Sequence, residues 1–204
     1  MASWSEHMYP VMEQFLTVQG EGAHTGKSAW FIRLGGCDVG CAWCDVKESW
    51  DVAAHPKVRC EDLVEQAKKS GAPICVVTGG EPAMHDLGPL TLGLQEAGLK
   101  THIETSGAHK MSGSWDWVTL SPKRFKATRQ DVYADADELK VVVVNRHDIA
   151  WGVEHAGNVS DDTALFFQPE WDRREKVIVH IMEHIRNQPR WRISLQTHKY
   201  LGLP

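Results

Sequence analysis

Three cysteines lie close together in the segment Gly36-Cys37-Asp38-Val39-Gly40-Cys41-Ala42-Trp43-Cys44-Asp45. The chain has five cysteines, and an odd count with three of them crowded into one loop favours metal ligation over disulfide bonding. Iron-sulfur clusters normally take four cysteine thiolates, so three thiolates leave one iron without a protein ligand. Cys37, Cys41 and Cys44 are therefore expected to hold a cluster with one iron open to a cofactor or substrate.

A zinc site is the alternative for this loop, completed by a histidine such as His24 or His55. Structural zinc sites usually bring their ligands in two well-separated pairs, and this spacing does not fit that pattern. The remaining cysteines, Cys60 and Cys75, fall at a predicted helix start and in a predicted buried strand, and are expected to be core residues.

Polar groups also follow three predicted strands. The first group is Thr78-Gly79-Gly80-Glu81-Pro82, the second is Glu104-Thr105-Ser106-Gly107, and the third is Ser121-Pro122-Lys123. Glycines let the backbone approach a ligand closely, and the carboxylates, hydroxyls and ammonium supply acceptors and donors. Since the carboxyl ends of parallel strands meet at one rim, these groups are expected to converge.

The Cys-x3-Cys-x2-Cys loop after a predicted strand resembles the signature of the radical S-adenosylmethionine superfamily. In that superfamily a 4Fe-4S cluster binds S-adenosylmethionine through its open iron, and one electron cleaves the sulfonium to give a 5′-deoxyadenosyl radical. The resemblance implies that Gly79, Gly80 and Glu81 hold the methionyl amino group and that Glu104 accepts from the ribose hydroxyls. The full set of cofactor contacts that it implies is Gly79, Gly80, Glu81, Glu104, Ser121, Lys123 and Gln168.

Segments outside the cysteine loop narrow the resemblance. Glu13 to Gly22 reads EQFLTVQGEG, Phe31-Ile32-Arg33-Leu34 precedes the cysteines, and the chain ends LQTHKYLGLP. Together they resemble the 7-carboxy-7-deazaguanine synthase family of queuosine and deazapurine biosynthesis, a pathway of tRNA modification. The resemblance implies that 6-carboxy-5,6,7,8-tetrahydropterin loses ammonia to become 7-carboxy-7-deazaguanine, with no catalytic side chain because the radical forms on the cofactor. It further implies a homodimer and an electron donor such as flavodoxin.

The types of residue in these segments suit a carboxypterin. Gln19 and Glu21 can complement the donors and acceptors along the pterin edge, and the planar guanidinium of Arg33 can bind the substrate carboxylate. In the family the chain's own C-terminus approaches the pterin, so the Pro204 carboxylate is expected to bind substrate. The substrate contacts expected are Gln19, Glu21, Arg33, Thr78, His198 and Pro204.

Val46 departs from the family pattern. Family members commonly carry a hydroxyl residue directly after the Cys-Asp pair, where it ligates magnesium, and a valine side chain cannot do so. Either the protein needs no magnesium, or the substrate, water and other groups hold the ion.

The elements that must position these residues follow from periodicity. Short apolar or β-branched runs between Gly and Pro predict six strands, and the continuous runs Ile74–Val77 and Val141–Val144 are typical of parallel strands buried on both faces. The predicted strands are Ala29–Leu34, Ile74–Thr78, Thr101–Thr105, Trp117–Leu120, Leu139–Val144 and Ala164–Gln168.

Helical segments lie between several of these strands. Helices are predicted over Cys60–Ser70, Asp86–Glu96 and Trp171–Asn187, while the polar stretch Val153–Asp162 is expected to be a surface loop. Alternating strands and helices indicate an α/β fold, which spacing alone leaves as an open sheet or an incomplete barrel. The resemblance selects an incomplete TIM-like barrel of about six mostly parallel strands.

Length and composition set the remaining bounds. The 204 residues suit one domain covering 1–204, and 42% hydrophobic and 24% charged residues are typical of a globular protein. A formal charge of -5 gives no broad footprint for direct nucleic-acid or membrane binding, so a small-molecule partner is favoured. No long apolar run or basic leader stands out, and a cytoplasmic protein is expected.

Two other functions are compatible with the cysteine loop. A glycyl-radical activating enzyme shares the spacing but acts on a large protein partner. A non-enzymatic metal-binding or electron-carrier module would need no second cofactor, and the convergent polar strand ends argue against it.

Overall fold

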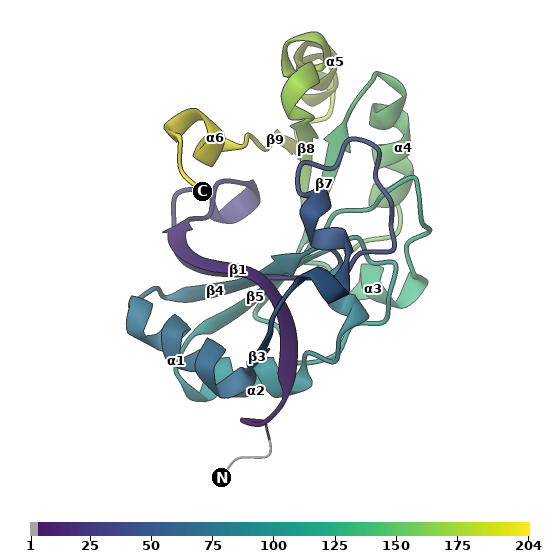
Figure 1. The fold of residues 1–204 in the computed structure, drawn as a ribbon. Coiled ribbons are helices and arrows are strands. Elements are labelled where there is room, and N and C mark those ends of the chain that lie inside the picture. Colours follow the sequence, from purple (N-terminus) through teal and green to yellow (C-terminus); the bar gives the residue numbers. More distant parts are fainter. Residues whose placement is uncertain (1–3) are drawn as a thin grey trace.

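The computed structural model describes residues 4–204, which contain one nine-stranded sheet in the order β3-β1-β2-β4-β5-β6-β7-β8-β9 (Figure 1). The strands from β2 to β9 in that order are parallel, and β1 and β3 add to the β2 edge in antiparallel pairing. The strand bounds are β1 Met8–Val18, β2 Ser28–Leu34, β3 Lys57–Arg59, β4 Ile74–Gly79, β5 Lys100–Thr105, β6 Trp117–Leu120, β7 Glu138–Val143, β8 Ala164–Pro169 and β9 Trp191–Ile193.

The sheet is curved and open, since β3 and β9 form its two edges and do not pair. This confirms the α/β incomplete barrel, with nine strands rather than about six. All six predicted strands are present, each within a residue of its expected bounds. The strands β1, β3 and β9 were not predicted, because β3 and β9 have three residues each and β1 carries Pro10 and an irregular register between Val11 and Glu13.

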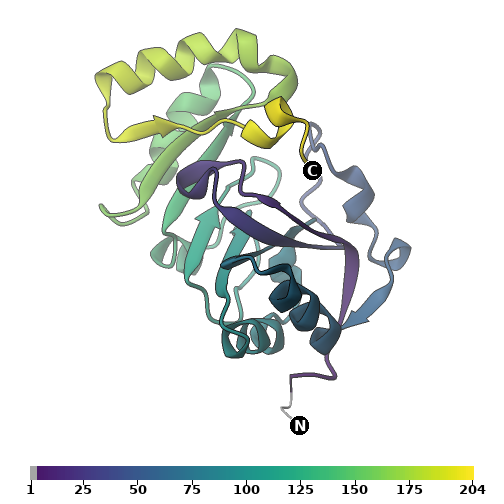
Figure 2. The ribbon, with the colours of Figure 1, turned by 90° about the vertical axis from the view of Figure 1, so that its left-hand side faces the viewer.

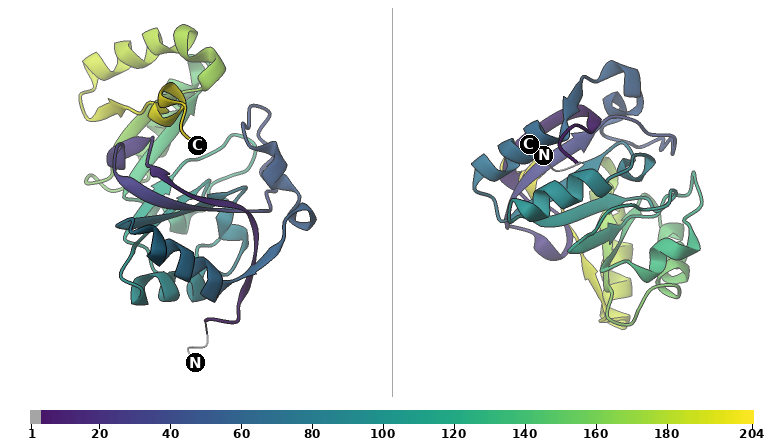
Figure 3. Two further views of the ribbon diagram at one scale, coloured as in Figure 1. Left: turned by 60° about the vertical axis from the view of Figure 1, so that its left-hand side comes forward. Right: turned by 90° about the horizontal axis from the view of Figure 1, so that it is seen from below.

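Of the six α-helices in the described part of the chain, α1 to α5 lie around the outside of the curved sheet (Figure 3), whereas α6 lies beside the loop between β1 and β2. The predicted helices are confirmed in α1, in α2 and in α5, which follows a short 3-10 turn at Trp171–Arg173. The expected loop over Val153–Asp162 is wrong in its first four residues, which end α4. The helix bounds are α1 Cys60–Ser70, α2 Gly88–Glu96, α3 Gln130–Ala134, α4 His147–Ala156, α5 Arg174–Asn187 and α6 Thr197–Leu201.

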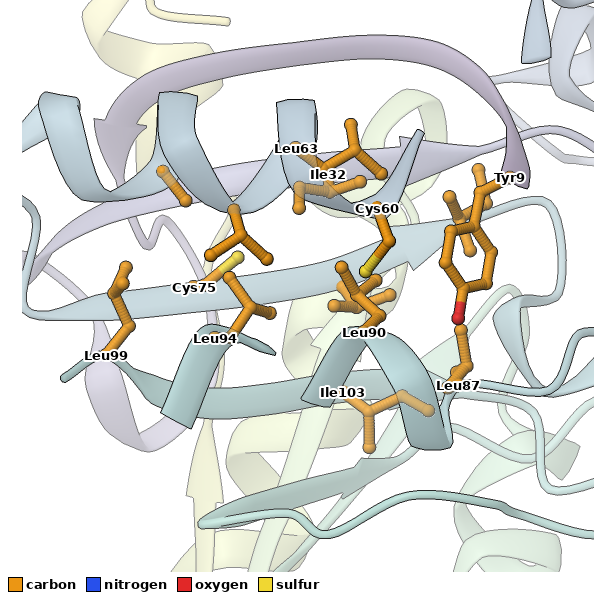
Figure 4. Packing of buried hydrophobic residues seen from close by; sticks show 14 of the residues in the cluster. Tyr9, Ile32, Cys60, Leu63, Cys75, Leu87, Leu90, Leu94, Leu99 and Ile103 are labelled. Atoms are coloured by element: carbon orange, nitrogen blue, oxygen red, sulfur yellow. The ribbon is translucent and has the colours of Figure 1, made fainter. Parts of the chain in front are cut away.

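Alternate residues of each central strand point out of the barrel and pack beneath the helices. One apolar cluster joins β2, β4 and β5 to α1 and α2 (Figure 4), and a second joins β7 and β8 to α5. Cys60 and Cys75 are both fully buried in the first cluster, as predicted. Burial of this kind contributes roughly 25 cal/mol per Å² of apolar surface, which fixes the register of the strands.

The other set of alternate residues faces the inside of the barrel, where the side chains become polar toward the carboxyl ends of the strands. On β2, Ile32 and Leu34 enter the core while Phe31 and Arg33 line a cavity. On β7, Leu139 and Val141 enter the core while Lys140 lines the same cavity. Because successive side chains of a strand point to opposite faces of the sheet, one set of alternate residues enters the core and the other set lines the cavity.

Two further features bear on the site. The C-terminal segment lies beside the loop between β1 and β2 (Figure 2), where Thr197 N–H and Oγ1 donate to the Gly20 carbonyl at 3.0 and 2.8 Å. Of the helices within residues 4–204, none has both the length and the apolar character needed to cross a membrane.

Candidate active site

One cavity of about 900 Å³ opens at the carboxyl ends of the strands. Every site residue predicted above, from the three cysteines to the C-terminal proline, lines this cavity. The residues lie on or shortly after β1, β2, β4, β5, β6 and β8 and in the C-terminal segment, so the fold brings together groups that are far apart in sequence. The predicted site residues therefore share one cavity, while the role of each residue stays a prediction.

The cysteine loop is held to its surroundings by backbone hydrogen bonds. The Gly36 N–H donates to the Ser49 carbonyl at 2.6 Å and the Cys37 N–H donates to the Trp50 carbonyl at 3.1 Å. Cys41 is buried, while Cys37 and Cys44 are half-buried. Burial raises the pKa of Cys41 to about 11, a shift that Lys123 opposes and to which Cys44 and Cys37 contribute.

The donor set of this loop is three thiolates, which fits an iron-sulfur cluster with one open iron. Within residues 4–204, no three His, Cys, Asp or Glu side chains converge closely enough to hold one metal ion. Each thiolate of an iron-sulfur cluster binds a different iron, so its cysteines are further apart than the ligands of one zinc ion. The histidines considered for zinc, His24 and His55, are not among the residues that line the cavity.

The Gly-Gly-Glu-Pro segment fits closely against the cysteine loop. A Cβ on Gly80 would lie 2.2 Å from the Gly36 carbonyl oxygen and 2.7 Å from the Cys37 Cβ, and Gly79 has a φ of 146°. The Gly80 and Glu81 N–H groups donate to the Leu34 and Gly36 carbonyls at 3.0 and 2.8 Å. Glycine is needed here for contact between two stretches of chain, which places the end of β4 against the base of the cysteine loop.

The Glu81 carboxylate is buried and already accepts four hydrogen bonds from the protein. Thr105 Oγ1 and the Ala83 N–H donate to Oε1 at 2.5 and 3.0 Å, and the Ser106 Oγ and N–H donate to Oε2 at 2.5 and 2.8 Å. These contacts tie the end of β4 to the end of β5. The cofactor contact expected of Glu81 stays a prediction, and the structure shows in addition that this side chain organises the rim.

Residues expected at the cofactor end also contact one another. Lys123 Nζ donates to the carbonyl oxygen and Oγ of Ser121, each at 2.6 Å. Burial lowers the pKa of Lys123, although Cys41 opposes this. Gln168 Oε1 accepts from Ser194 Oγ at 2.7 Å, which fixes the amide at the end of β8. The ammonium and the amide thus have defined positions on the cavity wall.

The residues expected at the pterin edge form a network with a lysine that sequence reasoning missed. Gln19 Nε2 donates to Glu104 Oε1 at 3.0 Å, and Gln19 Oε1 accepts from the Glu21 N–H at 3.0 Å. Lys140 Nζ donates to Glu21 Oε2 and, at 3.3 Å, to Glu104 Oε2. The signal for Lys140 was a charged residue inside an otherwise apolar strand.

Arg33 also lines the cavity, beside Thr78, with which it pairs in the β2 and β4 register. Its Nε donates to Glu13 Oε1 at 2.7 Å, and its side chain is 19% exposed. The Glu13 contact fixes the plane of the guanidinium on the cavity wall. A guanidinium can donate two parallel hydrogen bonds to one carboxylate, so Arg33 has the chemistry of a bidentate carboxylate site.

The C-terminal segment closes the cavity from the side. His198 packs on Gly20, where a Cβ would lie 2.1 Å from the ring Nδ1. Burial lowers the pKa of His198, with Glu21 opposing the shift. Thr17 Oγ1 donates to the Pro204 oxygen at 3.4 Å, so the last residue lies against β1. The tail is thus part of the cavity wall.

Aromatic side chains that the sequence did not single out complete the lining. They include a stacked pair, Phe15 and Phe31, whose ring centroids are 5.5 Å apart. Trp171 contacts Tyr200 of the C-terminal helix, with centroids 5.0 Å apart. Aromatic faces beside polar groups are typical of sites that bind flat heterocycles.

Comparison with known proteins agrees with this geometry. Residues 31–140 match the family model of the radical SAM superfamily. The chain is 51% identical to the 7-carboxy-7-deazaguanine synthase of Flavobacterium psychrophilum over 97% of this chain and 93% of that protein, and 47% identical to that of Synechocystis over 96% and 93%.

The fold has a solved counterpart as well. The crystal structure of QueE from Escherichia coli superposes with a TM-score of 0.81 at 36% identity, covering 94% of this chain and 95% of that one. Family model, near full-length relatives and fold therefore agree, and the chain belongs to the 7-carboxy-7-deazaguanine synthase family of radical SAM enzymes.

Proposed function

We propose that this enzyme converts 6-carboxy-5,6,7,8-tetrahydropterin to 7-carboxy-7-deazaguanine and ammonia, in a single domain spanning 1–204. The product and ammonia together contain the atoms of the substrate, so no further oxidant or reductant is consumed. The observation that carries the proposal is that Cys37, Cys41 and Cys44 line the same cavity as Gln19, Glu21 and Arg33.

Cys37, Cys41 and Cys44 would hold a 4Fe-4S cluster, and the residues at the ends of β4, β5, β6 and β8 would bind S-adenosylmethionine. When bound, these groups supply the 5′-deoxyadenosyl radical that takes one hydrogen atom from the substrate. The cofactor residues proposed are Gly79, Gly80, Glu81, Glu104, Ser121, Lys123 and Gln168.

The chain itself binds and orients the pterin. The Glu21 carboxylate accepts from the donor edge of the heterocycle, Gln19 orients Glu21 and Glu104, and Arg33 binds the substrate carboxylate. Thr78, His198 and the Pro204 carboxylate close the remaining sides. Fixing the substrate in this way aligns one hydrogen atom with the radical and excludes competing reactions.

The family relationship also supports proposals that lie outside the cavity. We infer a homodimer, a cytoplasmic location, an electron donor such as flavodoxin, and a place in queuosine and tRNA modification. Magnesium has a small effect on this enzyme, because the side chain at the position after Asp45 is the aliphatic Val46, which lines the cavity.

Product analysis tests the proposed reaction. Anaerobically reconstituted protein is incubated with dithionite, carboxypterin and a small amount of S-adenosylmethionine, and the products are identified by mass spectrometry. The expected result is many equivalents of 7-carboxy-7-deazaguanine and ammonia per S-adenosylmethionine, and no product from the tetrahydropterin that lacks the 6-carboxylate. Stoichiometric 5′-deoxyadenosine without a deazapurine would overturn the proposed substrate.

A further inference from the structure

Lys140 is a charged residue in the interior of the barrel. It lies on β7 between Leu139 and Val141, which are fully buried in the outer core, and its own side chain is 3% exposed. An ammonium group taken out of water is strongly unfavourable unless anions surround it. A lysine at this position therefore needs a set of acidic partners.

Two carboxylates from separate elements share this ammonium. Lys140 Nζ contacts Glu21 Oε2, in the loop between β1 and β2, and lies 3.3 Å from Glu104 Oε2 at the end of β5. Gln196 Nε2 donates to the second Glu21 oxygen at 3.0 Å, and Gln19 bonds to Glu104 and to the Glu21 backbone. Lys140 is thus the cation between two walls of the cavity.

A third carboxylate, Glu138, lies on the same strand and holds the loop that carries Glu21. Its Oε2 accepts from the Ala23 N–H at 2.9 Å, and a Cβ on Gly22 would lie 2.0 Å from its Oε1. Burial raises the pKa of Glu138, and Glu104 and Glu21 add to the shift. The loop therefore packs directly against β7, beside the lysine.

Charged side chains from several elements face Lys140. Burial opposes the charge on Lys140, but Glu104, Glu21 and Glu138 outweigh it and raise its pKa. Burial likewise opposes ionisation of Glu21, but Lys140 outweighs it and holds the pKa of that carboxyl well below its usual value, with His198 adding to the effect. Lys123 faces Lys140 as the neighbouring cation.

We propose that Lys140 is a positioning residue that holds Glu21 and Glu104 in place relative to each other. It thereby joins a residue proposed to bind the pterin, Glu21, to one proposed to bind the cofactor, Glu104. These two assignments rest on the proposed function. Without Lys140 the two half-buried carboxylates, which are 14% and 22% exposed, would lack a shared cation, and one would take up a proton. A protonated Glu21 cannot accept from the donor edge of the pterin.

The first test needs no bound cofactor. Thermal unfolding of the purified chain is measured from pH 5 to pH 8 for the wild type, K140M, E21Q and K140M/E21Q, with K100M as control, because Lys100 pairs with Asp116 at the surface with its side chain 68% exposed. In K140M, burial raises the pKa of Glu21 in the folded chain above its unfolded value, so stability falls as pH rises. We expect Tm of K140M to fall by about 10 °C at pH 8.

The deficit in Tm should shrink toward pH 5 and should be smaller in K140M/E21Q, which has one half-buried carboxylate fewer. A deficit that is equal at every pH, or equal in the double variant, overturns the proposal. Should K140M give no folded protein, K140Q provides the same comparison, because its amide still donates to a carboxylate but carries no charge.

The second test is kinetic and uses reconstituted enzyme. K140M should raise the carboxypterin KM by at least about tenfold and should move the acidic limb of the kcat/KM profile to higher pH, while K140R restores part of the activity and K100M changes neither quantity. A pH-independent loss in kcat alone contradicts the positioning role. If wild-type enzyme makes no deazapurine, the proposed function fails, and the thermal comparison still decides whether Lys140 holds the two carboxylates.

Discussion

The Lys199 ammonium donates to the Asp45 carboxylate at 2.7 Å, which joins the C-terminal helix α6 to the residue that directly follows Cys44. The two side chains are 23% and 59% exposed. Because His198 and Pro204 belong to the same segment, this pair connects the position of the cysteine loop to that of the residues proposed to close over the pterin.

Removing this ion pair should weaken substrate binding by a modest factor. K199M is expected to raise the carboxypterin KM by about threefold to fivefold with little change in kcat, because partly exposed pairs contribute up to about 1 kcal/mol. K69M is the matched control, since Lys69 pairs with Glu65 on α1 at 2.7 Å, remote from the cavity. Equal KM values for the two variants would argue against the connection.

Extending the chain beyond Pro204 should be more damaging. A short C-terminal tag converts the terminal carboxylate into a neutral amide and displaces the residue that Thr17 contacts. We expect a rise in the carboxypterin KM of about tenfold, corresponding to about 1.4 kcal/mol for a lost charged contact. The same tag on the N-terminus serves as control, and an unchanged KM after C-terminal extension would speak against a substrate-binding carboxylate.

Magnesium should matter little to the native enzyme and more to a variant. The Val46 side chain has no oxygen to offer, whereas its carbonyl already accepts from Ser49 Oγ at 2.7 Å. Chelation should change turnover of the wild type less than about twofold, and V46T should gain a measurable response to added magnesium. A large loss of wild-type turnover after chelation, restored by magnesium alone, would refute this prediction.

The buried His102 on β5 should make the stability of the fold sensitive to acid. His102 is 6% exposed and packs against His24, with ring centroids 4.6 Å apart, and burial, with His24 adding to it, lowers the pKa of His102 to about 4. A histidine in the unfolded chain has a pKa near 6.5. Between pH 6.5 and pH 4 the unfolded chain therefore binds a proton at His102 that the folded chain does not bind. Stability should therefore fall as pH drops from about 6.5 to about 4.

The expected loss attributable to His102 between pH 7 and pH 5 is about 2 kcal/mol in the free energy of unfolding. Urea unfolding of H102F at both pH values should show a correspondingly smaller acid loss than the wild type. H147F is the control, because His147 is exposed on α4. An acid loss in H102F as large as that of the wild type would rule out His102 as its source.

Local pattern was sufficient to predict the central strands and the cavity end of the sheet. The run at Ile74–Val77 is apolar because both of its faces are buried, whereas in Val141–Val144 the inward-facing Val142 and Val144 line the cavity. The short edge strand β9 and the irregular β1 depend on pairing with neighbours, which a local pattern does not contain. Glu81 likewise has an evident position from sequence, while three of its four hydrogen bonds come from Thr105 and Ser106 at the end of β5, which only the fold brings close.

Lys140 shows the same limit in the site. Its position within a strand was predicted, but its partners Glu21 and Glu104 lie 119 and 36 residues away along the chain. Tertiary structure alone creates that charge cluster, and a lysine in an apolar strand was the signal that a partner must exist.

Iron loading of two cysteine variants tests most directly whether Cys37, Cys41 and Cys44 carry a cluster. C41A changes a cysteine of the cavity and C60A changes one that is fully buried in the core. After anaerobic reconstitution, wild type and C60A should hold about four iron atoms per chain and cleave S-adenosylmethionine, while C41A should do neither. Equal iron content and cleavage in C41A and C60A, or tight zinc in place of iron in the wild type, would contradict the account.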